Sequence, residues 1–273
     1  MFNFNKCHPI ELNDLVRIGN EHDGGYIVSR RQIEKTDIVL SFGIRDDWTF
    51  EDDFSKRKDV KVYSYDYSTK DLPFLSNKFT IKFVNAFLGT GYSILRLRPN
   101  RIKHYLGTFQ RAKDFYNFFD GKKRHFVPKF IGQYDDEQNI SFETIFNELG
   151  DTEDMSIFLK MDIECAEYST LPKLIPFLDK LNGMAIEFHD LTRMAMEFDE
   201  LLDKFFTKFY VAHIHGCNFA GLIENTSIPS CLEMTFINKK IVPEKITLSR
   251  LEYPVKGLDA PCNIYRHDYK LLF

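Results

Sequence analysis

The chain has 273 residues, enough for one large domain or two small ones. Hydrophobic residues make up 44% and charged residues 28%, as in ordinary globular proteins, and 15% of the residues are aromatic. The net charge of −4 argues against a protein built to grip a nucleic acid backbone. No apolar run approaches the ~18 residues that a membrane-spanning helix needs. Because residues 1–10 also lack an apolar secretion signal, we expect a cytoplasmic protein.

The cysteines are odd in number and widely spaced. They are Cys7, Cys165, Cys217, Cys231 and Cys262, and no two of them form a Cys-x-x-Cys pair. This spacing predicts free thiols in a reducing compartment and no metal–thiolate framework.

Short apolar runs rich in β-branched residues alternate with helical segments. The expected strands cover residues 37–44, 60–66, 79–84, 156–163, 183–189 and 209–215, and the expected helices cover residues 49–57, 141–149, 166–181 and 193–208. This alternation predicts an α/β fold with a mostly parallel sheet covered on both faces. Residues 231–238 alternate more evenly and predict an antiparallel edge strand near the C-terminus.

Two segments fall outside this alternation. Residues 1–36 form a preface that ends in Asp-Gly-Gly-Tyr, and residues 91–130 form an insertion rich in basic and aromatic residues. We expect one domain over residues 1–273 in which 91–130 caps the active site, with Lys122, Lys123 and Arg124 contacting an acceptor. A cationic cap would suit a small anionic acceptor such as a nucleotide-linked sugar. A pair of solvated amphipathic helices is the simpler alternative, and the acidic net charge disfavours stacking on nucleic acid.

The ends of the first two expected strands indicate a cofactor. Ligands of an open parallel sheet bind beyond the carboxyl ends of its strands. Gly43 at the first end allows close approach to the backbone, and Asp66 at the second can accept hydrogen bonds from both ribose hydroxyls. No glycine-rich phosphate loop or P-loop lysine is present, and acids begin the next helix. This pattern indicates S-adenosylmethionine rather than NAD, FAD or ATP, although acids are also common in plain polar turns.

Residues 159–167 read Leu-Lys-Met-Asp-Ile-Glu-Cys-Ala-Glu. This segment resembles the (L/I)K(I/M)D(V/I)EGAE motif of the FkbM-type S-adenosylmethionine-dependent methyltransferases, with Cys165 in place of glycine. Residues 84–86 and 142–146 follow the family's order, and the Asp-Gly-Gly-Tyr and Ser-Phe-Gly-Ile segments look like a sugar-directed subgroup.

The resemblance spans roughly residues 17–236. It implies a Rossmann-like class I methyltransferase sheet and O-methylation of a carbohydrate or nucleotide-linked sugar hydroxyl, in surface polysaccharide biosynthesis. Residues 43–47 depart from the family's Gly-x-Asn-x-Gly-like loop. The cofactor contacts that we expect are Gly24, Gly25, Tyr26, Gly43, Asp66 and, near the adenine, Asn85.

Polar side chains also end the fourth, fifth and sixth expected strands. Glu187 shares a strand face with His189, as His213 does with His215, so Asp162, His189 and His215 can gather at one edge. A lone strand-end histidine is often only a packing residue, but several converging polar groups favour a site. We predict that His189, or as second choice His215, removes the proton from an acceptor hydroxyl. Asp162 and Glu187 complete the predicted catalytic set.

Other readings of these residues stay open. Asp162 and His189 could bind a divalent cation that acidifies the hydroxyl, and the residue set does not identify a metal. Two functions of other classes are a metal-dependent hydrolase that uses the Asp/Glu/His cluster and a non-catalytic nucleotide-sugar-binding protein. Binding of S-adenosylhomocysteine separates the methyltransferase from both.

Overall fold

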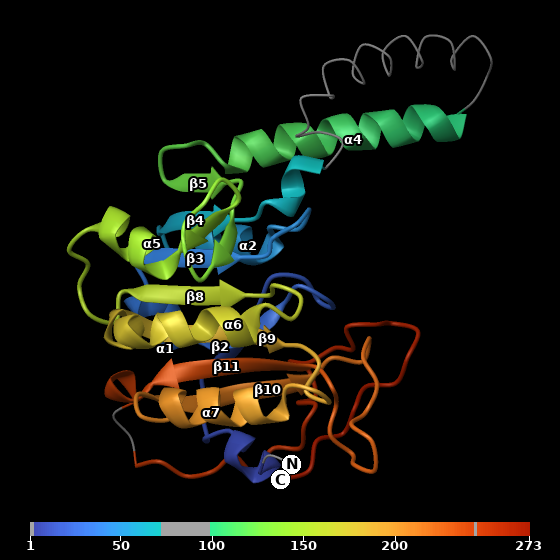
Figure 1. Ribbon diagram of the computed structural model, residues 1–273. Coiled ribbons are helices and arrows are strands. Elements are labelled where there is room, and N and C mark those ends of the chain that lie inside the picture. Colours follow the sequence, from blue (N-terminus) through green and yellow to red (C-terminus); the bar gives the residue numbers. More distant parts are fainter. Residues whose placement is uncertain (1–2, 72–98, 243–244) are drawn as a thin grey trace.

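A computed structural model describes residues 3–71, 99–242 and 245–273 and centres on a seven-stranded sheet (Figure 1). The strand order is β10-β11-β9-β8-β3-β4-β5. The strands are β3 (Ile38–Phe42), β4 (Lys61–Tyr65), β5 (Arg124–Val127), β8 (Ile157–Met161), β9 (Leu181–Phe188), β10 (Phe209–Gly216) and β11 (Leu232–Asn238). The run from β9 to β5 is parallel, and β11 is antiparallel to both of its neighbours.

This sheet confirms the predicted α/β fold with a mostly parallel, Rossmann-like sheet. One detail differs from the prediction. The strand β11 is antiparallel as expected, but it lies between β9 and β10, so β10 forms the edge of the sheet.

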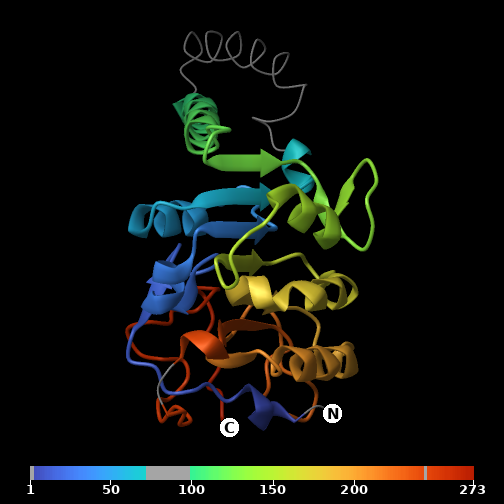
Figure 2. The ribbon, with the colours of Figure 1, turned by 90° about the vertical axis from the view of Figure 1, so that its left-hand side faces the viewer.

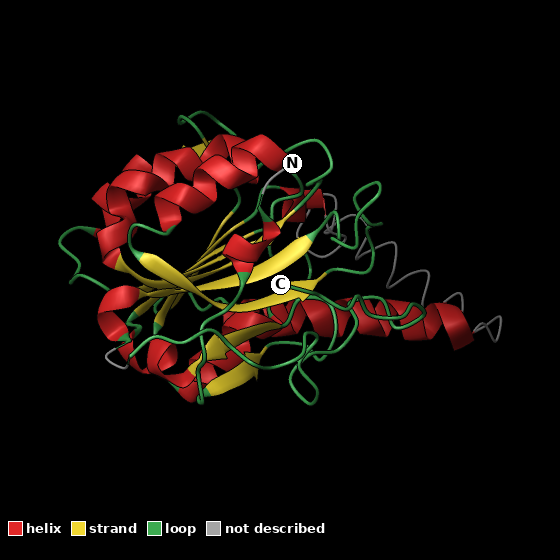
Figure 3. Ribbon diagram, turned by 90° about the horizontal axis from the view of Figure 1, so that it is seen from below, coloured by secondary structure: helices red, strands yellow, loops and turns green. Residues whose placement is uncertain are grey.

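Helices cover both faces of the sheet (Figures 2 and 3). The helices of the described chain are α1 (Arg30–Lys35), α2 (Thr49–Arg57), α4 (Pro99–Phe118), α5 (Phe142–Leu149), α6 (Glu167–Thr170), α7 (Ala195–Phe205), and the 3₁₀ segments η1 (Phe4–Cys7), η2 (Ser68–Asp71), η3 (Leu171–Lys180) and η4 (Lys239–Ile241). Two small sheets complete the fold: β1 (Leu15–Ile18) with β2 (Tyr26–Ser29), and β6 (Phe130–Gly132) with β7 (Asn139–Ser141). None of the helices described is long and apolar enough to cross a membrane.

The alternation of side chains along β3 explains the two covered faces. Leu40 and Phe42 pack with α5, η3 and α7 in the larger core, whereas Val39 points into a second core with β1, β2, α1 and α2. The expected helix over residues 166–181 divides into α6 and the 3₁₀ segment η3. Pro172 and Pro176 explain the division, because proline lacks the N–H that an α-helical hydrogen bond needs.

The edge at β5 corrects part of the predicted cap. β5 pairs in parallel with β4 and lies within residues 91–130, so the end of that segment belongs to the sheet. Lys123 pairs with Asp59, just before β4, and Arg124 begins β5. These basic residues therefore lie at the amino ends of the strands, opposite Asp66, and their predicted acceptor contact is wrong. The expected strand 79–84 lies outside the described residues, and the single-domain division stays a prediction.

The chain ends lie side by side (Figure 1). The Phe273 ring stacks on the rings of Phe4 and His8, with centroid distances of 5.3 and 4.5 Å. Residues 245–273 contain no helix or strand and run past β10 and β11 to the carboxyl ends of the parallel strands. This C-terminal segment therefore supplies side chains to one end of the sheet.

Candidate functional site

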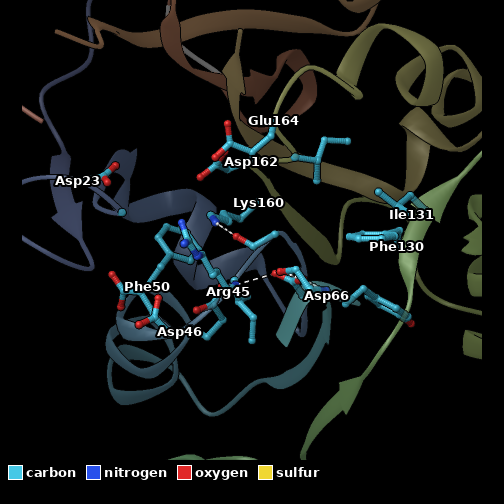
Figure 4. Close-up of a pocket in the computed structure, with 18 residues that line it drawn as sticks. Asp23, Arg45, Asp46, Phe50, Asp66, Phe130, Ile131, Lys160, Asp162 and Glu164 are labelled. Carbon is cyan, nitrogen blue, oxygen red and sulfur yellow. Dashed lines mark hydrogen bonds between the residues drawn. The ribbon is translucent and has the colours of Figure 1, made fainter. Parts of the chain in front are cut away.

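A cavity of about 450 Å³ opens at the carboxyl ends of β3, β4 and β8 (Figure 4). Its volume lies in the range of small-molecule and cofactor pockets. Gly24, Gly43, Asp66 and Asp162 line it, so four of the residues predicted for the site meet in one place.

Gly43 is required for the close approach of β3 and β8. Its φ of +79° lies in the left-handed region, and an added Cβ would lie 1.6 Å from the carbonyl oxygen of Asp162. The N–H of Asp162 also donates to the carbonyl of Phe42 at 3.0 Å. A side chain at residue 43 would push apart the two strand ends that form the cavity floor.

Asp66 follows β4, where its carboxylate organises two loops. One oxygen accepts from the backbone N–H of Arg45 at 2.6 Å, and the other accepts from the N–H and hydroxyl of Ser68 at 2.7 and 2.6 Å (Figure 4). A carboxylate has about four lone-pair sites, so Asp66 retains capacity for a further donor. The sequence predicted a carboxylate at the end of this strand, and the hydrogen bonds to Arg45 and Ser68 fix its orientation.

Lys160 belongs to the cavity lining, although its place in the 159–167 motif gave it no predicted role. Its side chain lines the cavity, and its ammonium group donates to the carbonyl of Gly43 at 3.1 Å (Figure 4). The same group lies 5.8 Å from the centre of the Tyr26 ring, at cation–π distance. Tyr26 therefore lies beside Lys160 and is not among the residues that line the cavity.

The other predicted cofactor contacts have different positions. Gly25 belongs to the turn before β2, where an added Cβ would lie 1.9 Å from the carbonyl oxygen of Asn20. This gives Gly25 a structural reason to be glycine. Asn85 lies outside the described residues. Phe130 and Ile131 of β6, which the sequence analysis did not single out, form an apolar wall next to Asp66 (Figure 4).

His189 lies just after β9, among acidic side chains. Its Nδ1 is 3.0 Å from Glu167, a carboxylate that can only accept, so Nδ1 carries the proton and donates it. Its Nε2 faces carboxylate oxygens of Asp162, Glu164 and Glu187 at 3.5 to 3.7 Å. One ring nitrogen is thus oriented and the other is directed to the edge of the cavity.

The charges around His189 set its protonation. Burial lowers the pKa of His189, but the hydrogen bond and charge of Glu167 and the charge of Asp162 outweigh burial, so its pKa lies above the ordinary value. Burial, followed by the charges of Asp162 and Glu233, raises the pKa of Glu187 well above its ordinary value. Glu187 therefore favours its neutral acid form.

His215 is brought to the same end of the sheet but is held differently. Its Nδ1 lies 2.8 Å from Glu233 and its Nε2 lies 3.0 Å from Asp268, and the residue is only 2% exposed. Burial lowers the pKa of His215, but the hydrogen bonds to Asp268 and Glu233 outweigh burial and raise it to about 11. An imidazolium with both nitrogens engaged is unsuited to accept a proton, so of the two histidines named in the sequence His189 is the better suited to act as a base.

Several partners in this cluster were not predicted. Glu167 was quoted in the motif but given no role, and Asp259, Cys262 and Asp268 come from the C-terminal segment. His213 Nε2 lies 3.1 Å from Asp259. The C-terminal segment has no hydrophobic periodicity, so only the abundance of polar residues in it could have suggested contact with the site.

Comparison with known proteins assigns no family to this chain. No family model matches the chain, and no curated protein matches it significantly in sequence. A similar solved structure is an rRNA methylase from Streptococcus thermophilus, with 10% identity over 77% of this chain and 92% of that chain and a TM-score of 0.36. Another is the Methanococcus jannaschii fibrillarin pre-rRNA processing protein, with 9% identity over 84% of each chain and a TM-score of 0.36.

A precorrin-6y C5,15-methyltransferase from Geobacter metallireducens is also similar, with 9% identity over 76% of this chain and 86% of that chain and a TM-score of 0.34. At these identities and TM-scores the likeness assigns no activity to this chain. The function must be inferred from the geometry of the site.

Proposed function

We propose that the chain is an S-adenosylmethionine-dependent O-methyltransferase. The observation that carries the proposal is the cavity at the carboxyl ends of β3, β4 and β8, with Asp66 fixed on its wall. This is the position at which a doubly wound sheet binds a nucleoside, and a strand-end carboxylate is the group that recognises ribose hydroxyls. The sequence has no phosphate-binding loop, which favours a cofactor without phosphate.

The lining of the cavity matches the parts of this cofactor. One ribose hydroxyl can use the remaining capacity of Asp66 and a second can replace the Ser68 hydroxyl, next to the apolar wall of Phe130 and Ile131 for the adenine. The ammonium group of Lys160 lies across the cavity and can pair with the carboxylate of the methionine part. The sulfonium would then lie near Asp162, with the methyl group directed to His189.

The proposed chemistry is transfer of the methyl group to a hydroxyl. His189 Nε2 accepts the hydroxyl proton while the oxygen attacks the methyl carbon in line and the sulfonium sulfur leaves as a thioether. Glu167 keeps the imidazole in the tautomer that leaves Nε2 free. A divalent cation held by Asp162 and His189 could instead acidify the hydroxyl; loss of activity on chelation and its return with Mg²⁺ or Mn²⁺ would favour this alternative.

We propose a carbohydrate acceptor because of the resemblance to the sugar-directed FkbM-type enzymes. The site adds one restriction. Asp162 and Glu164 surround the Nε2 of His189, so the part of the acceptor that meets the base should carry no negative charge. Any anionic part, such as a nucleotide, should lie away from this group of acids.

Asp66→Ala tests the cofactor assignment. Loss of the carboxylate leaves the ribose hydroxyls unpaired and should weaken S-adenosylhomocysteine binding by about 1–3 kcal/mol, or about 5- to 150-fold, in isothermal titration calorimetry. Asp59→Ala is the matched control, because Asp59 precedes β4 at its amino end and pairs with Lys123, whereas Asp66 follows the carboxyl end of the same strand. Equal affinity of the Asp66→Ala and wild-type proteins would refute the assignment. Hydrolysis that depends on added metal, without cofactor binding, would favour the hydrolase.

A further inference from the structure

Three carboxylates meet where the turn between β1 and β2 reaches the main sheet. Asp23 lies in that turn and lines the cavity (Figure 4), whereas Glu187 of β9 and Glu233 of β11 lie directly opposite each other in the register of the two strands. One carboxylate oxygen from each residue lies within 4.8 Å of one from each of the other two. We call Asp23, Glu187 and Glu233 the carboxylate cluster.

Repulsion within the carboxylate cluster favours a bound cation. Like charges directly opposite each other on neighbouring strands are destabilising, and Glu187 and Glu233 are each only 6% exposed. Burial, followed by the charge of Glu233, raises the pKa of Asp23 to about 6, even though the charge of Lys160 lowers it. The imidazolium of His215 pairs with Glu233 and offsets one of the three negative charges. A divalent cation would balance the other two.

The distances suit a large divalent ion. Three oxygens separated by up to 4.8 Å surround a centre that lies up to about 2.8 Å from each of them, and calcium–oxygen bonds are ~2.3–2.6 Å long. Oxygen ligands alone select calcium, magnesium or manganese rather than zinc. Magnesium requires near-ideal octahedral geometry at ~2.0–2.1 Å, which carboxylates from three separate segments meet less readily. Calcium is therefore the best fit.

The two buried carboxylates keep capacity for an ion. Glu233 accepts from His215 Nδ1 at 2.8 Å and from the thiol of Cys262 at 3.5 Å, and Glu187 accepts from the thiol of Cys231 at 3.0 Å. A carboxylate has about four lone-pair sites, so these hydrogen bonds leave others free. Carboxylates that bind a metal ion are commonly held by such hydrogen bonds, which fix their orientation.

The hydroxyl of Tyr26 gives a second, independent indication of a ligand. Tyr26 is only 3% exposed, and its hydroxyl has no hydrogen-bond partner among the described residues. Tyr26 and Glu233 border the same small cavity, and burial, followed by the charges of Asp162 and of the carboxylate cluster, raises the pKa of this hydroxyl. An unpaired buried hydroxyl costs free energy. A water molecule bound to the cation would supply the missing partner.

We propose that the carboxylate cluster binds one divalent cation, for which calcium is the best fit. The ion would enter from the cavity, because Asp23 lines it, and water would complete the coordination. It would join the β1–β2 turn to β9 and β11 and so fix the cavity wall that Asp23 and Gly24 form. This site differs from the alternative at Asp162 and His189. It is also independent of methyl transfer, since its test uses neither cofactor nor acceptor.

The test measures calcium binding to the full chain. After chelation and removal of the chelator, isothermal titration calorimetry with CaCl₂ should show saturable binding of one Ca²⁺ per chain. Asp23→Asn and Glu187→Gln each remove one ligand charge and should weaken this binding by about tenfold or more. Glu21→Gln is the matched control, because Glu21 is exposed in the same turn and lies outside the carboxylate cluster. It should bind Ca²⁺ as the wild type does.

His189→Ala separates this site from the alternative one. It should keep Ca²⁺ binding, because the imidazole is not a ligand of the carboxylate cluster. Loss of binding in His189→Ala, with wild-type affinity in Asp23→Asn, would place the ion at Asp162 and His189 and overturn the proposal. The wild-type titration keeps the proposal falsifiable if a variant does not fold, since absence of saturable Ca²⁺ uptake would overturn it. Equal affinity of folded Asp23→Asn and wild-type proteins would overturn it as well.

Discussion

His189 keeps one ring nitrogen on Glu167 and turns the other toward acidic groups, and this arrangement determines how activity should depend on pH. A base must be neutral to accept a proton, so activity should rise as pH increases through the pKa of His189 and then level off. Because that pKa lies above the ordinary value of 6.5, the rise should be centred above pH 6.5. His189→Ala should lower kcat by about a hundredfold or more.

Glu167→Gln tests the orienting role. The charge of Glu167 raises the pKa of His189, so its removal should move the rise in kcat to lower pH. Poorer positioning of the imidazole should also lower the plateau by about 10- to 100-fold. A pH profile of kcat measures both effects, and exposed Glu197→Gln on α7 is the control. A Glu167→Gln profile that keeps the wild-type midpoint would show that another group is the base.

Cys165 stands where the family motif has glycine, and the backbone explains the preference. Its φ of +77° lies in the left-handed region, which costs a residue with a side chain roughly 1–2 kcal/mol. Replacing Cys165 by glycine would remove this conformational cost, but the greater freedom of glycine in the unfolded chain would offset part of the gain in stability. Cys165→Gly should therefore raise the free energy of unfolding by about 0.5–1 kcal/mol in urea denaturation. Cys165→Val should lower it, because a branched side chain fits this region poorly.

A decrease in stability of Cys165→Gly would mean that the thiol makes a stabilising contact. The comparison with Cys165→Val separates the backbone effect from loss of the thiol, since both variants lack sulfur.

At the scale of elements, the buried strands were the most predictable part of the fold. β3, β8 and β9 are continuous apolar runs because both faces of the sheet are covered, and their carboxyl ends could be located within a few residues. Because the carboxyl ends of parallel strands meet at one side of the sheet, the positions of Gly43, Asp66 and Asp162 after their strands predicted that these residues lie together. This is why half of the candidate site was visible in the sequence.

The remaining elements depend on contacts that no local pattern encodes. β5 is short and only half-buried, so its basic sequence looked like part of a cap. The C-terminal segment is held by side-chain contacts such as Asp259 with His213 and Asn218 with the Asn263 backbone. Such contacts have no periodicity, and they enclose His215 between Glu233 and Asp268, whereas Nε2 of His189 lies 3.7 Å from Asp162 and Glu164 of the cavity lining.

At the scale of the whole molecule, two sets of ionisable groups lie along the sheet, and Glu187 of β9 lies within reach of both. The cavity with Asp66 lies over β3, β4 and β8, whereas His215 and the buried cysteines Cys217, Cys231 and Cys262 lie at the β10–β11 end. His189, after β9, lies between them in the strand order. Cofactor binding should therefore be insensitive to changes at the far end of the sheet, where the two chain ends meet.

Phe273→Ala tests this separation. The Phe273 ring contacts the rings of Phe4, His8 and Tyr253, with centroids 4.5–5.6 Å apart, and so joins the C-terminal segment to the start of the chain. Because the ring is only partly buried, its loss should lower the free energy of unfolding by about 1–3 kcal/mol in urea denaturation. The affinity for S-adenosylhomocysteine should stay at the wild-type value in calorimetry.

Leu272→Ala is the matched control for Phe273→Ala, since Leu272 is the adjacent residue and is 64% exposed. It should leave both stability and affinity unchanged, because an exposed side chain loses little on truncation. If Phe273→Ala weakens cofactor binding while the protein remains folded, the two ends of the sheet are coupled. The join between the chain ends would then help to shape the cavity, in addition to stabilising the C-terminal segment.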